Sequence, residues 1–339
     1  MRRWMGLLLA IAIAVAGCTS APTLAPLPQA PPPSGAPIAD MRPVEQAAEY
    51  FAVRYGREHV IVVYDIDNTL LAMDSLIGSD QWVNWQLGTD AGAQQITRCT
   101  DCFFRLQGLI YLAHAMRVTS RTVPEVVGGL HDAGFTEWVL TSRSPEYAPA
   151  TLRELWRRNL HFSPFENGHV RAPVGPADAY DAETLQRLFT PDEQTRWKLG
   201  AARPVLMTDG VYFTTGQHKG AMLRLLLDRL RMTDSVRAIV YADDTPRHVT
   251  GMQEAFADSK IDLRAYRYAA EDEHVREMDD ATTRQRATDE WCGFAPNLQA
   301  ITATFEKDVL DLAKDCTMPI EQCFSTRMCA PPAKSATTH

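Results

Sequence analysis

The amino-acid sequence predicts an α/β fold in which a parallel sheet is flanked by helices. Two observations lead to this prediction. Short β-branched runs alternate with amphipathic stretches, which is the pattern of strand–helix–strand units. The clearest of these runs lead directly into polar motifs, as is typical of the carboxyl ends of parallel strands. The chain of 339 residues is long enough for one large α/β domain with inserted elements, or for a core with a cap.

The expected elements follow from periodicity and from Gly or Pro at their ends. Helical apolar spacing covers residues 43–55, 124–133, 221–231 and 247–257. Strand-like runs cover residues 59–64, 136–140, 204–207, 211–214 and 236–241, of which 211–214 is expected to return as a hairpin after Asp209-Gly210. Residues 74–122 have no strong strand pattern and form an insert that could cap a site. Trp82 and Trp85 lie at helical spacing within it and are expected in its core.

The N-terminus has the features of a lipoprotein signal peptide. Arg2 and Arg3 precede an apolar run, residues 5–16, which is too short for a comfortable membrane span of about 20 residues. Val15-Ala16-Gly17-Cys18 resembles a bacterial lipobox, in which Cys18 is acylated. We therefore expect a signal peptide over 1–18, a Pro- and Ala-rich tether over 19–42, and a lipid-anchored protein of the cell envelope. Thr19 after the cysteine favours the outer membrane of a Gram-negative bacterium.

The composition indicates which partners are disfavoured and what the cysteines do. The formal net charge is −8 and the pI about 5.6, and no Lys/Arg run with interleaved aromatics is present, so nucleic acid is a poor partner. Six cysteines besides Cys18 favour disulfides in an exported protein, with unknown pairing; they are Cys99, Cys102, Cys292, Cys316, Cys323 and Cys329. Zinc bound by Cys99, Cys102 and two later cysteines is the alternative. The main domain is expected over 43–290 and a Cys-rich helical extension over 291–339.

The polar motifs contain residues suited to phosphoryl transfer. Asp65 and Asp67 follow the run 59–64 and share one face of an extended path. One carboxylate can attack phosphorus while the other transfers protons, although Asp residues also cap turns after strands. Thr141 ends a later strand, and Lys219 precedes a helix, where a cation opposes the helix dipole. His218 is expected to be structural.

A third carboxylate motif, Asp243-Asp244, follows the run 236–241. Adjacent aspartates repel each other unless a cation offsets them, so this pair favours a metal. Asp244 with Thr245-Pro246 is also a helix-start pattern. We assign Asp243 as the metal ligand and expect Asp244 to lie next to this ligand without binding the metal itself.

The order of these motifs resembles the haloacid dehalogenase (HAD) superfamily, and the likeness covers residues 59–250. It implies a Rossmann-like core, Asp65 as nucleophile, and Asp67 as the acid/base residue that also offers its backbone carbonyl to Mg²⁺. It further implies that Thr141 and Lys219 bind phosphate, and that Asp243 completes the metal site. Arg143 is expected to clamp the phosphate.

The resemblance implies a magnesium-dependent phosphomonoester hydrolase that acts on a small phosphate ester or a phosphoprotein. The nearest likeness is to a branch of exported bacterial HAD-like proteins of largely uncharacterised function, some of which are thought to be protein-tyrosine phosphatases. Class C acid phosphatases are a more distant likeness. A dehalogenase would not need Asp67 or a metal. A catalytically silent HAD-fold protein that binds a ligand or assists envelope assembly is the alternative.

Overall fold

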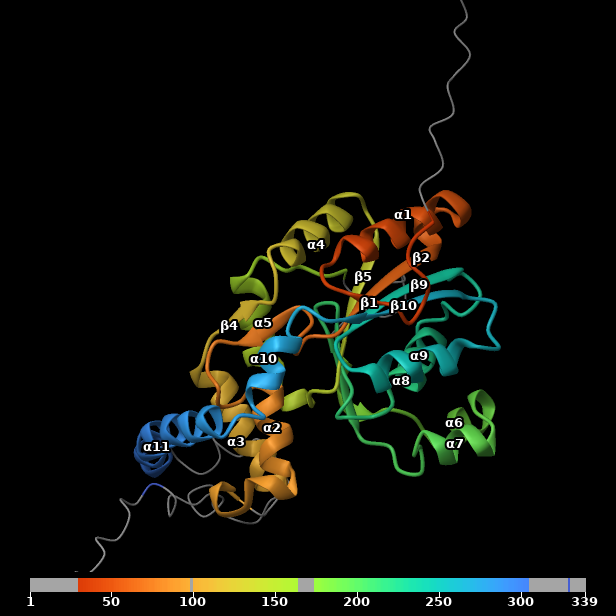
Figure 1. Cartoon of the computed structure of the whole chain (residues 1–339). Coiled ribbons are helices and arrows are strands. Elements are labelled where there is room, and N and C mark those ends of the chain that lie inside the picture. The colour runs from red at the N-terminus through yellow and green to blue at the C-terminus, as the bar shows by residue number, and fades with distance from the viewer. Residues whose placement is uncertain (1–29, 98–99, 164–173, 305–328, 330–339) are drawn as a thin grey trace, which may run out of the picture.

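The computed structural model describes residues 30–97, 100–163, 174–304 and 329 (Figure 1). The expected signal peptide, Cys18, Cys99, Cys316 and Cys323 lie outside these residues. Within them, eight strands form one sheet in the order β1-β10-β9-β2-β5-β8-β7-β6. Their bounds are β1 Pro37–Ile38, β2 Val60–Tyr64, β5 Thr136–Thr141, β6 Val174–Asp178, β7 Pro204–Thr208, β8 Val211–Phe213, β9 Ala238–Asp243 and β10 Asp262–Tyr268.

The sheet is mostly parallel, as the sequence predicts. Every neighbouring pair from β1 through β10, β9, β2 and β5 to β8 is parallel. β7 and β8 form the expected hairpin, and β6 pairs antiparallel with β7 at the edge. β9 ends two residues later than expected, so Asp243 is its last residue.

Helices cover both faces of the sheet (Figure 1). Because successive side chains of a strand point to opposite faces, Val62 of β2 packs into one core and Val63 into the other. The first core contains residues of α1 Arg42–Tyr55, α4 Thr122–Asp132 and α5 Ala148–Arg157. The second contains residues of α8 Lys219–Arg229 and α9 Pro246–Phe256, with α6 Ala182–Leu188 and α7 Pro191–Arg196 beside them. The short 3₁₀ helices are η1 Arg57–His59, η2 Thr89–Gln94 and η3 Pro145–Tyr147.

The insert is helical and is closed by a two-stranded ribbon. β3 (Leu71–Met73) and β4 (Met116–Val118) pair antiparallel at its two ends, and α2 (Asp80–Leu87) and α3 (Thr100–Ala113) lie between them. The three-residue strands were not predicted. Trp82 is 1 % exposed and stacks on Phe103, which confirms its expected place in the insert core.

The C-terminal helices pack against this insert. They are α10 (Asp272–Glu277) and α11 (Ala281–Thr304), and α11 runs across the boundary expected at residue 290. Leu76 N donates a hydrogen bond of 3.0 Å to Glu290 Oε2. A disulfide joins Cys292 to Cys329, in agreement with the expectation of disulfides. Cys329 is therefore fastened to α11, which packs against the insert.

Part of the segment expected as a tether belongs to the folded domain. The sequence assigned residues 19–42 to it, but Pro37–Ile38 forms the edge strand β1 beside β10, and Met41 is fully buried. Ser34 adds a hydrogen bond, since Ala265 N donates to its Oγ over 3.0 Å. Low charge and many prolines predict extended backbone, and extended backbone also suits an edge strand. Residues 19–29 of the expected tether lie outside the described residues.

A buried carboxyl group lies inside the first core. Glu137 of β5 is completely buried and accepts a hydrogen bond of 2.8 Å from the Tyr64 hydroxyl. Within the described residues its second oxygen, Oε2, has no hydrogen-bond partner. Burial raises the pKa of Glu137 to about 8, and the Tyr64 hydrogen bond opposes this rise. Glu137 is thus expected to be protonated in the folded protein at neutral pH.

The described part of the chain contains no helix that combines the length and the apolar character needed to cross a bilayer.

Candidate functional site

The polar residues that follow the central strands meet at one edge of the sheet. Asp65 comes directly after β2, while β5 ends in Thr141 and β9 in Asp243. β2 pairs with β5 on one side and with β9 on the other, all three in parallel. Asp65 N donates a hydrogen bond of 2.9 Å to Ala242 O, which extends the pairing to the first catalytic candidate. The carboxyl ends of three adjacent strands therefore define the site.

Lys219 joins two of the carboxylates. Its Nζ lies 2.6 Å from Asp65 Oδ1 and 2.6 Å from Asp243 Oδ2, and its side chain is 1 % exposed. Lys219 is the first residue of α8, and the preceding His218 caps this helix by accepting a hydrogen bond of 3.1 Å from Ala221 N. A cation is disfavoured at a helix N-terminus, so the two buried carboxylates must stabilise it. His218 has the structural role that the sequence predicted.

Every oxygen of the Asp243 carboxylate has protein partners. Oδ1 accepts a hydrogen bond of 2.8 Å from Thr245 N, and Oδ2 accepts one from the Tyr241 hydroxyl as well as from Lys219. His248 Nδ1 lies 3.2 Å from both oxygens. Asp243 is therefore held rigidly as the anchor of Lys219. Tyr241 and His248 were not predicted, although Tyr241 could have been found two residues before Asp243 on the same face of β9.

Asp67 is held by Arg143. Arg143 Nε donates to Asp67 Oδ2 over 2.9 Å and Nη2 donates to Oδ1 over 2.7 Å, a bidentate pair. Nη1 of the same guanidinium donates to Thr151 Oγ1 over 2.8 Å, and its plane lies over the Tyr111 ring at 4.2 Å. The Arg143 side chain is 3 % exposed and that of Asp67 20 %. The sequence predicted that Arg143 would clamp phosphate, but its donors are directed at Asp67.

Two threonines fix the loops around the site. Thr141 Oγ1 accepts a hydrogen bond of 3.1 Å from Arg143 N, and its hydroxyl hydrogen remains available as a donor. Thr69 Oγ1 accepts one of 2.9 Å from Asp244 N, which ties the loop after β2 to the end of β9. Within the described residues, the one hydrogen bond to the Asp244 carboxylate comes from Thr245 Oγ1, at 3.1 Å.

The insert contributes a further acid, Asp80, that the sequence did not single out. It opens α2, whose N-cap is Ser79, and its Oδ2 accepts a hydrogen bond of 3.1 Å from Asn84. Burial raises the pKa of Asp80 to about 6, and the negative charge of Asp67 adds to this effect. Neighbouring Gln81 accepts a hydrogen bond of 3.4 Å from Asn68 Nδ2. The first turn of α2 therefore lies against the loop that follows β2.

Three carboxyl groups that are buried or half-buried lie close together in the site. Burial raises the pKa of Asp65 to about 8, Lys219 opposes this rise, and Asp243 and Asp67 add to it. Burial also raises the pKa of Asp244, as do the charges of Asp243 and Asp65. For Asp243, burial acts in the same direction, but Lys219 and His248 hold its pKa below the usual range. Asp65, Asp243 and Asp244 thus face one ammonium group, because Arg143 is paired with Asp67.

This excess of hard oxygen donors suits a divalent cation. Within the described residues, Asp65, Asp243 and His248 place possible ligand atoms within 4.8 Å of one another. Two contacts speak against this set. The Lys219 ammonium lies between the two carboxylates, and His248 Nδ1 faces carboxylate oxygens, to which it must donate. The Asp244 carboxylate, which has fewer protein partners than that of Asp243, is an alternative to Asp243 as a ligand beside Asp65.

All the predicted site residues from Asp65 to Asp244 lie at this one edge of the sheet, while Cys18 is outside the described residues. Comparison with known proteins finds one family, described as "Protein of unknown function (DUF2608)", which matches residues 38–308. No curated protein and no solved structure matches the chain. The matched range contains the whole site and all of the sheet except Pro37, the first residue of β1.

Proposed function

The chain thus belongs to the DUF2608 family, whose function is unknown, and from the geometry of its site we propose that it is a metal-dependent phosphomonoester hydrolase. The observation that carries the proposal is Lys219 Nζ at 2.6 Å from both Asp65 and Asp243 at the carboxyl edge of a parallel sheet. A nucleophilic carboxylate repels a phosphate dianion unless a fixed cation offsets the charge. The order of the motifs resembles that of the HAD superfamily and supports the same proposal. In this proposal the insert serves as the cap over the site.

In the first step, an Asp65 oxygen attacks phosphorus opposite the leaving group. The phosphorus–oxygen bond of the ester breaks, and the leaving alkoxide takes a proton from Asp67. An aspartyl-phosphate on Asp65 and a free alcohol result. Lys219 offsets the charge that collects on the phosphoryl oxygens, and the Thr141 hydroxyl can donate to one of them.

In the second step, water attacks the aspartyl-phosphate. Asp67 takes one proton from that water, the acyl phosphate bond breaks, and phosphate leaves with Asp65 restored as a carboxylate. Arg143 is a positioning residue in both steps, because its bidentate pair fixes the plane of the Asp67 carboxylate. To donate a proton, Asp67 must carry it on an oxygen that has loosened its contact with Arg143.

The metal that the resemblance implies is Mg²⁺, and the donor set fits a hard cation of this kind. Asp65 and Asp244 would hold it, together with the Asp67 backbone carbonyl. When bound, it would supply a Lewis acid at the phosphoryl oxygens. Calorimetric titration with Mg²⁺ tests the ligands without reference to activity. Asp244→Asn should abolish binding, whereas Asp243→Asn should weaken it less; the reverse order would assign Asp243 as the ligand.

The substrate class is a small phosphate ester or a phosphoprotein, with nucleic acid disfavoured by the net charge of −8. We further propose that the protein is held at the outer membrane through Cys18, which is supported by the lipobox at Val15–Cys18.

Hydrolysis of p-nitrophenyl phosphate by the purified chain tests the proposed function. Turnover should require Mg²⁺ and disappear in Asp65→Asn. Asp209→Asn is the matched control, since it removes an exposed aspartate from the β7–β8 hairpin and should retain activity. No turnover by well-folded wild-type protein would contradict the proposal and favour a catalytically silent binding protein.

A further inference from the structure

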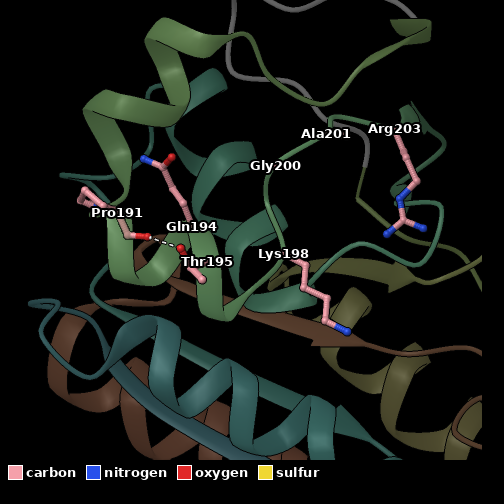
Figure 2. A pocket seen from close by; sticks show the side chains of 7 residues that line it. All are labelled: Pro191, Gln194, Thr195, Lys198, Gly200, Ala201 and Arg203. Atoms are coloured by element: carbon pink, nitrogen blue, oxygen red, sulfur yellow. Dashed lines mark hydrogen bonds between the residues drawn. The ribbon is translucent and has the colours of Figure 1, made fainter.

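An open pocket of about 710 Å³ lies beside α7, outside the catalytic residues. Seven residues line it: Pro191, Gln194, Thr195, Lys198, Gly200, Ala201 and Arg203. Figure 2 shows Lys198 and Arg203 on one side of this pocket, with Gln194 and Thr195 across from them. With two cations on one side and polar side chains on the other, the pocket is suited to an anionic ligand.

The charge of the pocket is unusual for this protein. Its lining contains two cations and no acidic side chain, although the chain as a whole carries a net charge of −8. Within the described residues, neither Lys198 nor Arg203 forms an ion pair, while Arg187, Arg224 and others nearby do. Both side chains are exposed. Two unpaired cations that face one opening favour the binding of an anion.

The pocket is connected to the loop that carries Lys219. Arg203 N donates a hydrogen bond of 3.0 Å to Gln217 Oε1, and Gln217 Nε2 donates one of 3.1 Å to Arg203 O. Gln217 is 5 % exposed and lies two residues before Lys219. Arg203 also precedes β7, which runs antiparallel to β8, so the start of β7 lies at the catalytic edge of the sheet. Arg203 of the pocket therefore lies at the same edge of the sheet as the catalytic candidates.

We propose that Lys198 and Arg203 bind a second anionic group of the substrate, so that the enzyme acts on phosphate esters that carry another negative charge. This inference rests on the proposed function. β7 is three strands from β2 in the sheet order, which corresponds to roughly 14 Å at about 4.8 Å per strand. An extended peptide covers that distance in about four residues. A short bisphosphate does not, so the favoured substrate is a phosphopeptide with an acidic residue about four positions away.

Two phosphotyrosyl peptides test the proposal, one with glutamate four residues to either side and one with glutamine there. Both peptides have the same leaving group, the tyrosine phenolate, so a difference in kcat/KM reports on the flanking residues. The full chain should hydrolyse the acidic peptide with about tenfold higher kcat/KM, and K198A/R203A should reduce this ratio to near one. Arg231→Ala is the matched control, because Arg231, like Lys198, is an exposed cation with positive φ after a helix. It should retain the preference.

Equal kcat/KM for the two peptides, or an undiminished preference in K198A/R203A, would overturn the subsite. Faster cleavage of 1,3-propanediol bisphosphate that depends on the same two residues would overturn the peptide assignment. If neither the peptides nor p-nitrophenyl phosphate is hydrolysed, the proposed function fails. Fluorescence anisotropy of the labelled peptides with the wild-type chain then still tests the subsite. Tighter binding of the acidic peptide that K198A/R203A abolishes would support it, and equal binding would refute it.

Discussion

The free energy of unfolding of Glu137→Gln, measured relative to that of the wild type, should increase from acidic to neutral pH. The folded pKa of Glu137 is raised by burial to about 8 from an ordinary value of 4.5. A raised carboxyl pKa means that stability is fully present below pH 4.5 and is lost as pH rises toward 8, because only the unfolded chain releases the proton in that range. The loss amounts to about 1.4 kcal/mol per pH unit, or about 3 kcal/mol between pH 5 and 7.5.

Urea unfolding followed by tryptophan fluorescence at pH 5, 6, 7 and 7.5 measures this effect. Glutamine stays neutral and can still accept the hydrogen bond from Tyr64, so the difference in unfolding free energy between Glu137→Gln and wild type should grow by about 3 kcal/mol across the range. In this difference, the contributions of all other titrating groups to the unfolding free energy cancel. Glu183→Gln, at an exposed position on α6, is the control variant. A flat difference for Glu137→Gln would mean that Glu137 is ionised in the folded protein, and the reasoning would fail.

Three further changes have defined outcomes. Lys219→Met leaves two buried carboxylates without their shared cation, so we expect loss of p-nitrophenyl phosphate turnover and a loss of about 3 kcal/mol in urea unfolding; unchanged stability would contradict the buried pairing. Arg143→Lys replaces a bidentate fork with a point charge, and kcat should fall about tenfold with little change in KM, whereas a selective rise in KM would indicate a phosphate clamp after all. Cys292→Ser opens a disulfide with a sequence separation of 37 and should lower the unfolding free energy by about 3 kcal/mol; no change would show that α11 is held by packing alone.

The central strands could be predicted from the sequence because their physical causes are local. β2 is a continuous run of β-branched and aromatic residues, and β9 has such a run at its centre. Both strands are fully buried, and aspartates stand at the carboxyl end of each. β10 was missed because Arg and Tyr alternate along it and only part of the strand is buried. β3 and β4, at three residues each, exist through their pairing across the insert, which sequence periodicity does not reveal.

The residues of the candidate site likewise fall into those that the sequence predicts and those that it does not. Asp65, Lys219 and Asp243 could be brought together in advance because parallel strands and the helix after β8 place their ends at one edge. The contacts of Asp80 and His248 depend on how α2 and α9 pack, and no spacing in the sequence encodes these distances. Arg143 was noticed, but its partner was not, because the choice between phosphate and Asp67 is set by side-chain direction.

The position of β2 has a consequence for how such a protein can change. The chemistry that we propose belongs to β2, β5, β9 and the loop after β8, all of them interior to the sheet, while β1 and β6 form its two margins. Marginal strands and the segments next to them can be lengthened, shortened or replaced without moving the interior strands. Diversification at the β6–β7 margin would therefore alter which molecules are accepted, while the reaction performed on them stayed the same.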